Sequence, residues 1–304
     1  MFPVLFEIPG IGFKVRSFGV LVALGFLVGL HVGGRLARRF GDDPEEDPAR
    51  FGHAGAAMLI GVIAGARLLY VVVEIARYLA AEDGSGETGE RFVEEPWTIL
   101  AVWQGGLVMY GGFLGAVVLG MRSVRKLGMR PLAALDYGLT AGFVGLGIGR
   151  IGCLLVGDDY GDVVPESLAG LPFPLTITVP SLEWLSRNEA SLFPPALAGE
   201  VLWATQVWMS VNAFALAGVG LFLLRRRRFP GHTTLWLVLL YALTRFTIEA
   251  FRGDAIRGVW AFGLSTSQLI SIVVAAACVV LVVRTRGRRE PMPGSLAGAG
   301  AGAR

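Results

Sequence analysis

The chain has 304 residues, of which 54% are hydrophobic and 17% are charged, and its mean hydropathy is +0.60. Soluble domains carry about 25% charged residues, so these values exclude an ordinary soluble enzyme or binding module. The net charge of +3 comes largely from arginine clusters beside apolar segments. Such clusters report membrane topology, and they argue against a nucleic-acid partner.

In chain order, seven apolar segments are predicted to cross the membrane. They cover residues 17–37, 55–73, 107–121, 133–156, 201–224, 233–251 and 265–283. Basic clusters follow the first, third, fifth and seventh segments, whereas the other connections contain few lysines and arginines. The positive-inside rule therefore predicts an all-α integral membrane protein with seven transmembrane helices, its N-terminus outside and its C-terminus in the cytoplasm.

One long polar insertion lies between the fourth and fifth predicted helices, at residues 157–200. It contains seven acidic residues and a single basic one, Arg187. We expect a small extracytoplasmic head within a single membrane domain that covers residues 1–290. Residues 291–304 are rich in glycine and alanine, and we expect them to form a disordered tail.

The fourth predicted helix combines small residues with a charge. Four glycines at steps of three and four share one helical face, which lets another backbone or a lipid headgroup approach closely. They are Gly142, Gly145, Gly149 and Gly152. Arg150 lies among them at a cost of roughly 2.5–3.5 kcal/mol on insertion scales, so we expect it to have an anionic partner. Asp158 and Asp159 follow closely, although most such acidic pairs are simply solvated.

The sixth predicted helix carries the clearest polar face, formed by Tyr241, Arg245, Glu249 and Arg252. Arg245 and Glu249 are spaced for an i,i+4 ion pair, which lowers the cost of both charges in a bilayer. The pair by itself is also compatible with a purely structural link between two helices. Arg252 adds a second cation, and a net positive face of guanidinium groups favours a phosphate ligand.

Two further positions are candidates. Tyr110 has paired glycines on both sides, which indicates either room for a ligand or a sharp bend, or simply helix packing. Arg67 is a third intramembrane arginine, which could bind substrate or extend to the outer interface. No cysteine or histidine spacing is typical of a metal site, so no metal or other cofactor is expected.

At these residues the chain resembles the prolipoprotein diacylglyceryl transferases, a bacterial inner-membrane family, over about residues 17–283. Four blocks carry the resemblance: residues 103–115, 149–161, 195–200 and 241–252. The resemblance implies transfer of a diacylglyceryl group from phosphatidylglycerol to the lipobox cysteine of preprolipoproteins. It also implies that Arg150 contacts the lipid headgroup, that Arg245 and Glu249 form an essential ion pair, and that Arg252 and Gly161 keep their family identities.

Several positions depart from the family pattern. Tyr110 replaces a histidine, Cys153 and Val156 replace asparagines, Asp158 replaces a glutamate, and Phe18 replaces a tyrosine. The leading hypothesis is a transferase in which Tyr110 and Asp158 replace lost polar partners while Arg150 and Arg252 bind the phosphate.

Two alternatives stay open at this point. The first is a non-catalytic or altered-acceptor relative that binds anionic phospholipid, and the second is a seven-helix transporter. The expected partners of the transferase are phosphatidylglycerol, preprolipoproteins and the lipid bilayer, in a bacterial plasma membrane.

Overall fold

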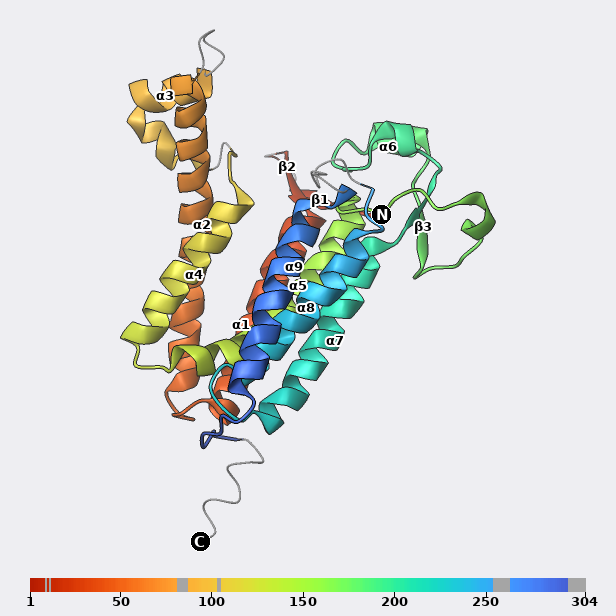
Figure 1. The fold of residues 1–304 in the computed structure, drawn as a ribbon. Helices are drawn as coiled ribbons and strands as arrows, with labels where there is room; N and C mark the ends of the chain where they lie inside the picture. Colours follow the sequence, from red (N-terminus) through yellow and green to blue (C-terminus); the bar gives the residue numbers. More distant parts are fainter. Residues whose placement is uncertain (9, 11, 81–86, 103–104, 254–262, 295–304) are drawn as a thin grey trace. The chain divides into compact units, whose positions relative to one another are not determined.

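The computed structural model describes residues 1–304 except 9, 11, 81–86, 103–104, 254–262 and 295–304 (Figure 1). The chain divides into two compact units. The first unit comprises Met1–Gly41 and Leu135–Arg304, and the second comprises Asp42–Ala134.

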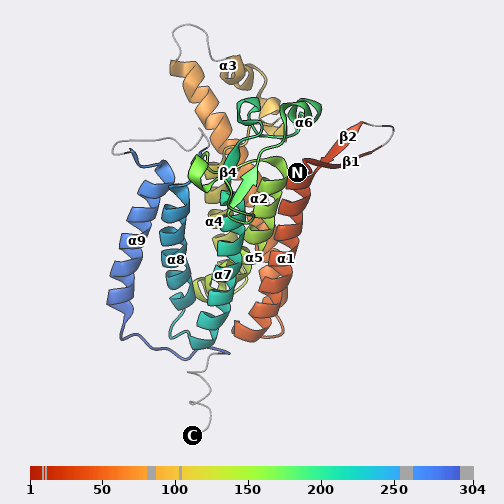
Figure 2. The same ribbon diagram turned by 90° about the vertical axis from the view of Figure 1, so that its right-hand side faces the viewer.

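The first unit contains five long helices that run side by side (Figures 1 and 2). They are α1 (Ser17–Phe40), α5 (Pro131–Val156), α7 (Thr205–Arg226), α8 (His232–Glu249) and α9 (Thr266–Thr285). A buried apolar cluster around Phe143 and Leu237 joins α5, α7 and α8. The predicted glycine face of α5 meets α1, because a methyl group on Gly25 would lie 2.5 Å from the carbonyl oxygen of Gly145. That face therefore accommodates another backbone, which is one of the two partners expected for it.

The second unit is built on the pairing of α2 (Asp47–Ala80) with α4 (Met109–Lys126). A methyl group on Gly65 would lie 2.9 Å from the Cα atom of Gly115, so glycines bring these two backbones together as well. The short helix α3 (Glu87–Glu94) packs against α2, and a 3-10 turn follows at Pro96–Leu100. Neither element was predicted, because residues 87–100 lie in a connection between two of the predicted membrane segments.

The head follows α5 and has a small fold of its own. It contains β3 (Thr176–Thr178), α6 (Leu182–Arg187), β4 (Val201–Trp203) and 3-10 turns at Glu166–Leu168 and Pro195–Leu197. Strands β3 and β4 pair antiparallel in the register Thr176↔Trp203. Val179, Leu185, Phe193 and Leu202 form its buried core. The expectation that the fifth membrane helix begins at residue 201 is corrected, because Val201–Trp203 completes this sheet and α7 begins at Thr205.

Other boundaries also differ from the expectation. Residues preceding α1 form a hairpin of β1 (Val4–Ile8) and β2 (Phe13–Arg16), which the mixed composition of this stretch did not predict. Helix α8 ends at Glu249, so Arg252 lies beyond the helix on which it was predicted. In the expected tail, Met292 is buried and the carbonyl oxygen of Pro293 accepts a hydrogen bond from Arg227, while residues 295–304 lie outside the described part.

The membrane character of the chain is evident from its helices. Within the described residues, five helices are long and apolar enough to cross a bilayer: α1, α2, α5, α7 and α9. Helices α4 and α8 are each 18 residues long, and they do not belong to that set. The protein is therefore a helical membrane protein, and the number of seven spans stays a prediction.

Candidate active site

A chain of five charged side chains lies where the head meets α5 and α8. Arg150 of α5 pairs with Asp159, and Nη2 of Arg252 lies 2.6 Å from the other oxygen of that carboxylate, Oδ1. Oε2 of Glu249 lies 3.6 Å from Nη1 of Arg252 and 2.7 Å from Nη2 of Arg245. Three guanidinium groups thus share two carboxylates. This ion-pair chain, as we call it, carries one net positive charge.

Asp159 is placed by a tight turn at the end of α5. Its backbone φ is +53°, a left-handed conformation that is uncommon outside glycine, asparagine and aspartate. The carboxylate of Asp158 accepts a 2.9 Å hydrogen bond from the Asp159 backbone N–H. The first two residues of α7 hold the same turn, because Thr205 Oγ1 donates to the carbonyl of Asp159 (2.8 Å) and Gln206 Nε2 donates to that of Asp158 (3.0 Å).

Glu249 is the buried centre of the ion-pair chain, with a side chain only 1% exposed. Its second oxygen, Oε1, accepts a 3.1 Å hydrogen bond from Ser265 Oγ. Ser265 is the N-cap of α9 and forms a capping box with Gln268, so its position is fixed by the start of that helix. Burial of a carboxylate is tolerated only with such partners, and here they come from two different helices.

The charge state of Asp159 follows from its neighbours. Partial burial by itself raises the pKa of this carboxyl group, but the guanidinium groups of Arg150 and Arg252 lower it further than burial raises it. The net result is a pKa below the ordinary value. Asp159 is therefore a carboxylate at neutral pH, and it keeps both arginines charged and close together.

Gly161 connects the acidic turn to the end of α8. It forms a β-bridge with Arg252, and its N–H donates to the carbonyl of Trp203 at 3.2 Å. A methyl group at Gly161 would collide with that carbonyl and with the Trp203 side chain. The backbone N–H of Asp162 also donates to the carbonyl of Phe251 at 2.8 Å. The predicted importance of Gly161 thus has a backbone explanation, because no larger residue fits between β4 and the Arg252 segment.

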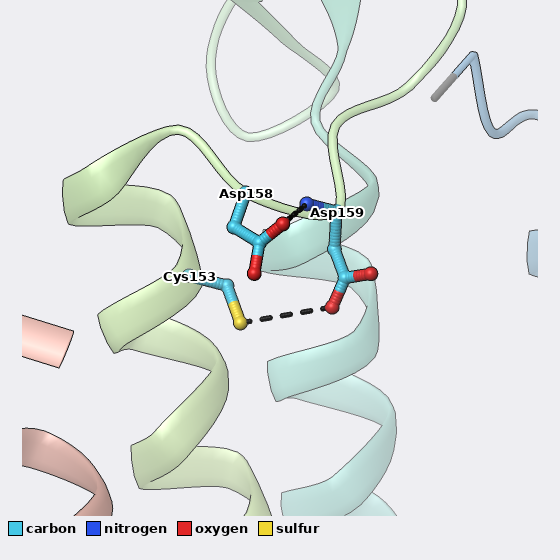
Figure 3. A group of neighbouring side chains, drawn as sticks. All are labelled: Cys153, Asp158 and Asp159. Atoms are coloured by element: carbon cyan, nitrogen blue, oxygen red, sulfur yellow. Dashed lines mark hydrogen bonds between the residues drawn. The ribbon is translucent and has the colours of Figure 1, made fainter. Parts of the chain in front are cut away.

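Cys153 lies against the ion-pair chain. Figure 3 shows its thiol pointing from α5 toward the carboxylate of Asp159, with Asp158 on the turn between them. The Sγ atom lies 3.7 Å from Asp159 Oδ2 and 3.9 Å from Nη1 of Arg150. The side chains of Cys153, Asp158 and Asp159 offer ligand atoms that lie within 4.8 Å of one another, a grouping compatible in size with a metal ion. Because two guanidinium groups already neutralise Asp159, a further cation there is electrostatically disfavoured, and we interpret the group as part of the ion-pair chain.

An aromatic cluster adjoins Arg252. The rings of Trp203, Trp208 and Phe251 pack with centroid separations of 5.4–5.7 Å. Tryptophan is enriched at membrane–water interfaces, and Trp208 lies in the first turn of α7, a candidate membrane span. The cluster therefore indicates that Arg252 lies near the level of the lipid headgroups.

Arg67 and Tyr110 belong to the second unit. The Arg67 side chain donates to the backbone carbonyls of Thr98, Ile99, Gly105 and Gly106 at 2.7–3.2 Å. These contacts give no support to a substrate-binding role, and they assign this guanidinium to the fold of the segment before α4. Gly105 and Gly106, the glycine pair before Tyr110, both have positive φ, a backbone conformation that glycine adopts without strain. Tyr110 itself is 54% exposed at the start of α4.

Several sequence-predicted residues thus meet in one place, and others were missed. The structure brings together Arg150, Arg245, Glu249 and Arg252, including the expected i,i+4 pair. The carboxylate that bridges two of the arginines is Asp159, whereas Asp158 had been selected by its alignment with the family's glutamate. Thr205, Gln206 and Ser265 were also missed. A hydroxyl or amide residue at a helix start was the available signal for them.

Sequence comparisons identify the family of the chain. A sequence model of the prolipoprotein diacylglyceryl transferases matches residues 3–284. The phosphatidylglycerol–prolipoprotein diacylglyceryl transferase of Geobacter sulfurreducens is 30% identical over 291 residues, which cover 93% of this chain and 96% of the relative. The proteins of that name from Rhodospirillum centenum and Clostridium tetani are 26% and 29% identical, and the matches cover 89% and 90% of this chain and 87% and 93% of the relatives. The chain belongs to the prolipoprotein diacylglyceryl transferase family.

Proposed function

We propose that this protein transfers a diacylglyceryl group from phosphatidylglycerol to the lipobox cysteine of preprolipoproteins. The observation that carries this proposal is the ion-pair chain. Its three arginines and two carboxylates leave one positive charge, and it lies beside an interfacial aromatic cluster. A single lipid phosphate has the opposite charge and is found at that level of a bilayer. Family membership and the names of the relatives support the same function.

The chemistry assigns the arginines a task beyond binding. The acceptor sulfur forms a bond to the terminal glycerol carbon of the diacylglyceryl group, and the bond from that carbon to the phosphate oxygen breaks. The electron pair leaves with glycerol phosphate, and the thiol proton passes to a base. Negative charge therefore grows on the phosphate oxygens in the transition state. Guanidinium groups already held in place stabilise that charge without reorganisation.

Each residue of the ion-pair chain then has a distinct role. Arg150 and Arg252, joined by Asp159, bind the phosphate. Arg245 and Glu249 organise the site from α8, since Glu249 is buried and contacts both Arg245 and Arg252. Asp158 stabilises the turn through the Asp159 N–H. Tyr110 belongs to the other unit, and its predicted role as a hydrogen-bond donor to a phosphate oxygen rests on its alignment with the family's histidine alone.

The proposed topology has seven spans, with α4 and α8 added to the five apolar helices. Basic residues in the last turns of α1, α4, α7 and α9 support a cytoplasmic location for those ends. The N-terminus and the head then lie outside, and the C-terminus lies in the cytoplasm of a bacterium. Phosphatidylglycerol, preprolipoproteins and the bilayer are the partners.

An in vitro transfer assay tests the function. Purified protein in detergent is incubated with phosphatidylglycerol and a lipobox peptide, and mass spectrometry detects the diacylglyceryl thioether on the peptide cysteine. We expect product with the wild type, none with Arg245→Ala, and wild-type turnover with Arg187→Ala, whose side chain is 74% exposed on α6. Absence of product from the wild type would contradict the transferase.

The same preparations separate the transferase from a lipid-binding relative, which the replacement of both family asparagines, by Cys153 and Val156, brings into consideration. Retention of phosphatidylglycerol that depends on Arg150, without any thioether, would favour that relative. For the transferase we expect Tyr110→Phe to lower turnover strongly, whereas a non-catalytic protein has no turnover to lose. Unchanged phospholipid affinity in Arg150→Ala would contradict the role given to that arginine.

A further inference from the structure

The head carries an apolar loop whose side chains are not buried in the core of the head. Residues 171–175 read Leu-Pro-Phe-Pro-Leu, and no charged residue occurs between Glu166 and Glu183. The side chain of Phe173 is 65% exposed and that of Leu175 is 43% exposed. Exposing two large apolar side chains on a charge-free stretch is unfavourable in water, so this surface is suited to an apolar environment.

The loop is held firmly against the start of a membrane helix. The indole Nε1 of Trp208 donates to the carbonyl of Pro174 at 3.0 Å, and the backbone N–H of Ala204 donates to the carbonyl of Leu175 at 3.0 Å. Within the loop, the N–H of Leu175 donates to the carbonyl of Pro172. These bonds join the 171–175 loop to the first turn of α7. The distance between the loop and the N-terminal end of α7 is therefore fixed.

The length of α7 sets the depth of the loop. Helix α7 has 22 residues, and at about 1.5 Å per residue it is only slightly longer than the hydrocarbon layer of about 30 Å. Arg225 and Arg226 occupy its last turn, so its cytoplasmic end lies at the opposite interface. Trp208, in the first turn, then lies within the outer interfacial layer. The 171–175 loop, bonded to Trp208, lies at the same level.

From these observations we infer that the 171–175 loop inserts into the outer interfacial layer of the bilayer, beside α7, and anchors the head on the lipid surface. Figure 1 shows α6 at the end of the head away from the long helices, whereas the segment around β3 extends back toward them. The anchor adjoins the Trp203–Trp208–Phe251 cluster that precedes Arg252. It would keep the ion-pair chain at headgroup level. The inference rests on the membrane location of α7 and does not depend on the proposed reaction.

An apolar peptide segment is the other occupant that such a surface could take. The lipid is favoured because the loop is tied to an interfacial tryptophan at the end of a membrane helix, where lipid is the surrounding medium. Lipid also contacts the loop at all times, whereas a peptide would be present only during turnover. The two occupants differ in when the loop is protected from water.

Hydroxyl-radical footprinting of the unsubstituted protein in phosphatidylglycerol-containing nanodiscs tests the inference. Leu182, on α6, is the matched control within the head, because its side chain is 58% exposed and likewise apolar. The expected rate for an unprotected side chain is obtained from the measured rate of Leu182, scaled by exposure and by the reactivity of the free amino acid. We expect Phe173 and Leu175 to be modified at least fivefold more slowly than this rate. Modification at the full expected rate, or protection only after a lipobox peptide is added, would overturn the inference.

A substitution provides the second measurement. Phe173→Asp places a charge in the inserted loop and should increase the modification rate of Leu175 in nanodiscs, while Leu182 keeps its rate. Leu182→Asp, on α6, should leave the protection of Phe173 unchanged. Thioether formation by the same nanodisc preparations is scored separately, so that unprotected Phe173 and Leu175 in an active unsubstituted protein contradict the anchor and leave the transferase standing.

Discussion

Two buried arginine environments differ in their acceptors, that of Arg67 in the second unit and that of the ion-pair chain in the first. In the second unit, the Arg67 guanidinium is surrounded by neutral acceptors, namely four backbone carbonyls, and by the rings of Tyr70 and Phe92 at 5.5 and 5.3 Å. In the first unit, Arg150, Arg245 and Arg252 contact carboxylates. Both environments compensate the cost of removing a guanidinium from water.

The difference shows why only one of the two environments is suited to chemistry. Backbone carbonyls accept the hydrogen bonds of the Arg67 guanidinium. The orientation of this guanidinium is therefore fixed by the backbone segment before α4, which it in turn holds in place. In the ion-pair chain, two carboxylates neutralise two of three cations, so the five groups together keep one positive charge. In the proposed mechanism an anionic substrate balances that charge. A buried arginine in a membrane protein is therefore informative about function only once its acceptors are known.

Removal of Glu249 should have the largest effect. Glu249→Gln leaves three guanidinium groups with one carboxylate, and breaking a buried ion pair costs about 3–5 kcal/mol. We expect a much lower unfolding midpoint in detergent and no thioether product. Glu183→Gln is the matched control, since Glu183 also pairs with an arginine at i,i+4 but is 73% exposed. Equal midpoints for the two variants would contradict a central role of Glu249.

Substitution of Arg67 should come next and should act on the fold alone. Arg67→Met removes hydrogen bonds from a charged donor to four carbonyls, and we expect a loss of about 2–3 kcal/mol. Hydrogen–deuterium exchange should increase in residues 95–102 and 105–108, while the affinity of the folded fraction for phosphatidylglycerol stays unchanged. Arg67→Lys should recover little, because an ammonium group cannot reach the same fork of acceptors. A fall in lipid affinity at an unchanged unfolding midpoint would restore Arg67 to the substrate site.

A smaller effect with a defined pH dependence is expected for Asp159→Asn. The folded-state pKa of Asp159 lies below the unfolded value of about 3.9, so the carboxylate stabilises the fold fully above that value. This contribution is lost as the pH falls through the folded-state pKa. We expect the variant to be less stable than the wild type by about 1–2 kcal/mol at pH 7, and the two midpoints to converge as the pH falls below about 3.9 and through the folded-state pKa. A difference that is independent of pH would contradict the charge-based role.

The sequence predicted those parts of the site that depend on helical spacing, and it missed those that depend on tertiary turns. Arg245 and Glu249 are four residues apart on one helix, so their contact follows from local geometry. The choice between Asp158 and Asp159 depends on a left-handed residue and on two hydrogen bonds from α7. Alignment to the family pattern selected Asp158, whereas the carboxylate that pairs with Arg150 and Arg252 belongs to the next residue, because one residue of offset in a turn changes the direction of the side chain.

The same reasoning explains the errors in the fold. Long apolar segments predicted the helices, since a bilayer demands internally satisfied backbone groups. Strand β4 was not predicted because its three residues are as apolar as the helix that follows them. Its identity as a strand depends on its pairing with β3. The packing of Met292 likewise depends on side chains far away in sequence, which composition does not report.

The smallest effect is expected at the start of α7, where neutral groups hold the acidic turn. Thr205→Val preserves the shape of the side chain and removes one hydrogen bond to the Asp159 carbonyl, so we expect a loss of about 1 kcal/mol. Because Asp159 then holds Arg150 and Arg252 less rigidly, the KM for phosphatidylglycerol should rise more than kcat falls. Thr205→Ser retains the hydroxyl and should recover most of the affinity. If Thr205→Val lowers only the unfolding midpoint, the hydrogen bond from α7 stabilises the fold without affecting lipid binding by the ion-pair chain. The site would then contain both purely structural contacts and contacts that act on the substrate.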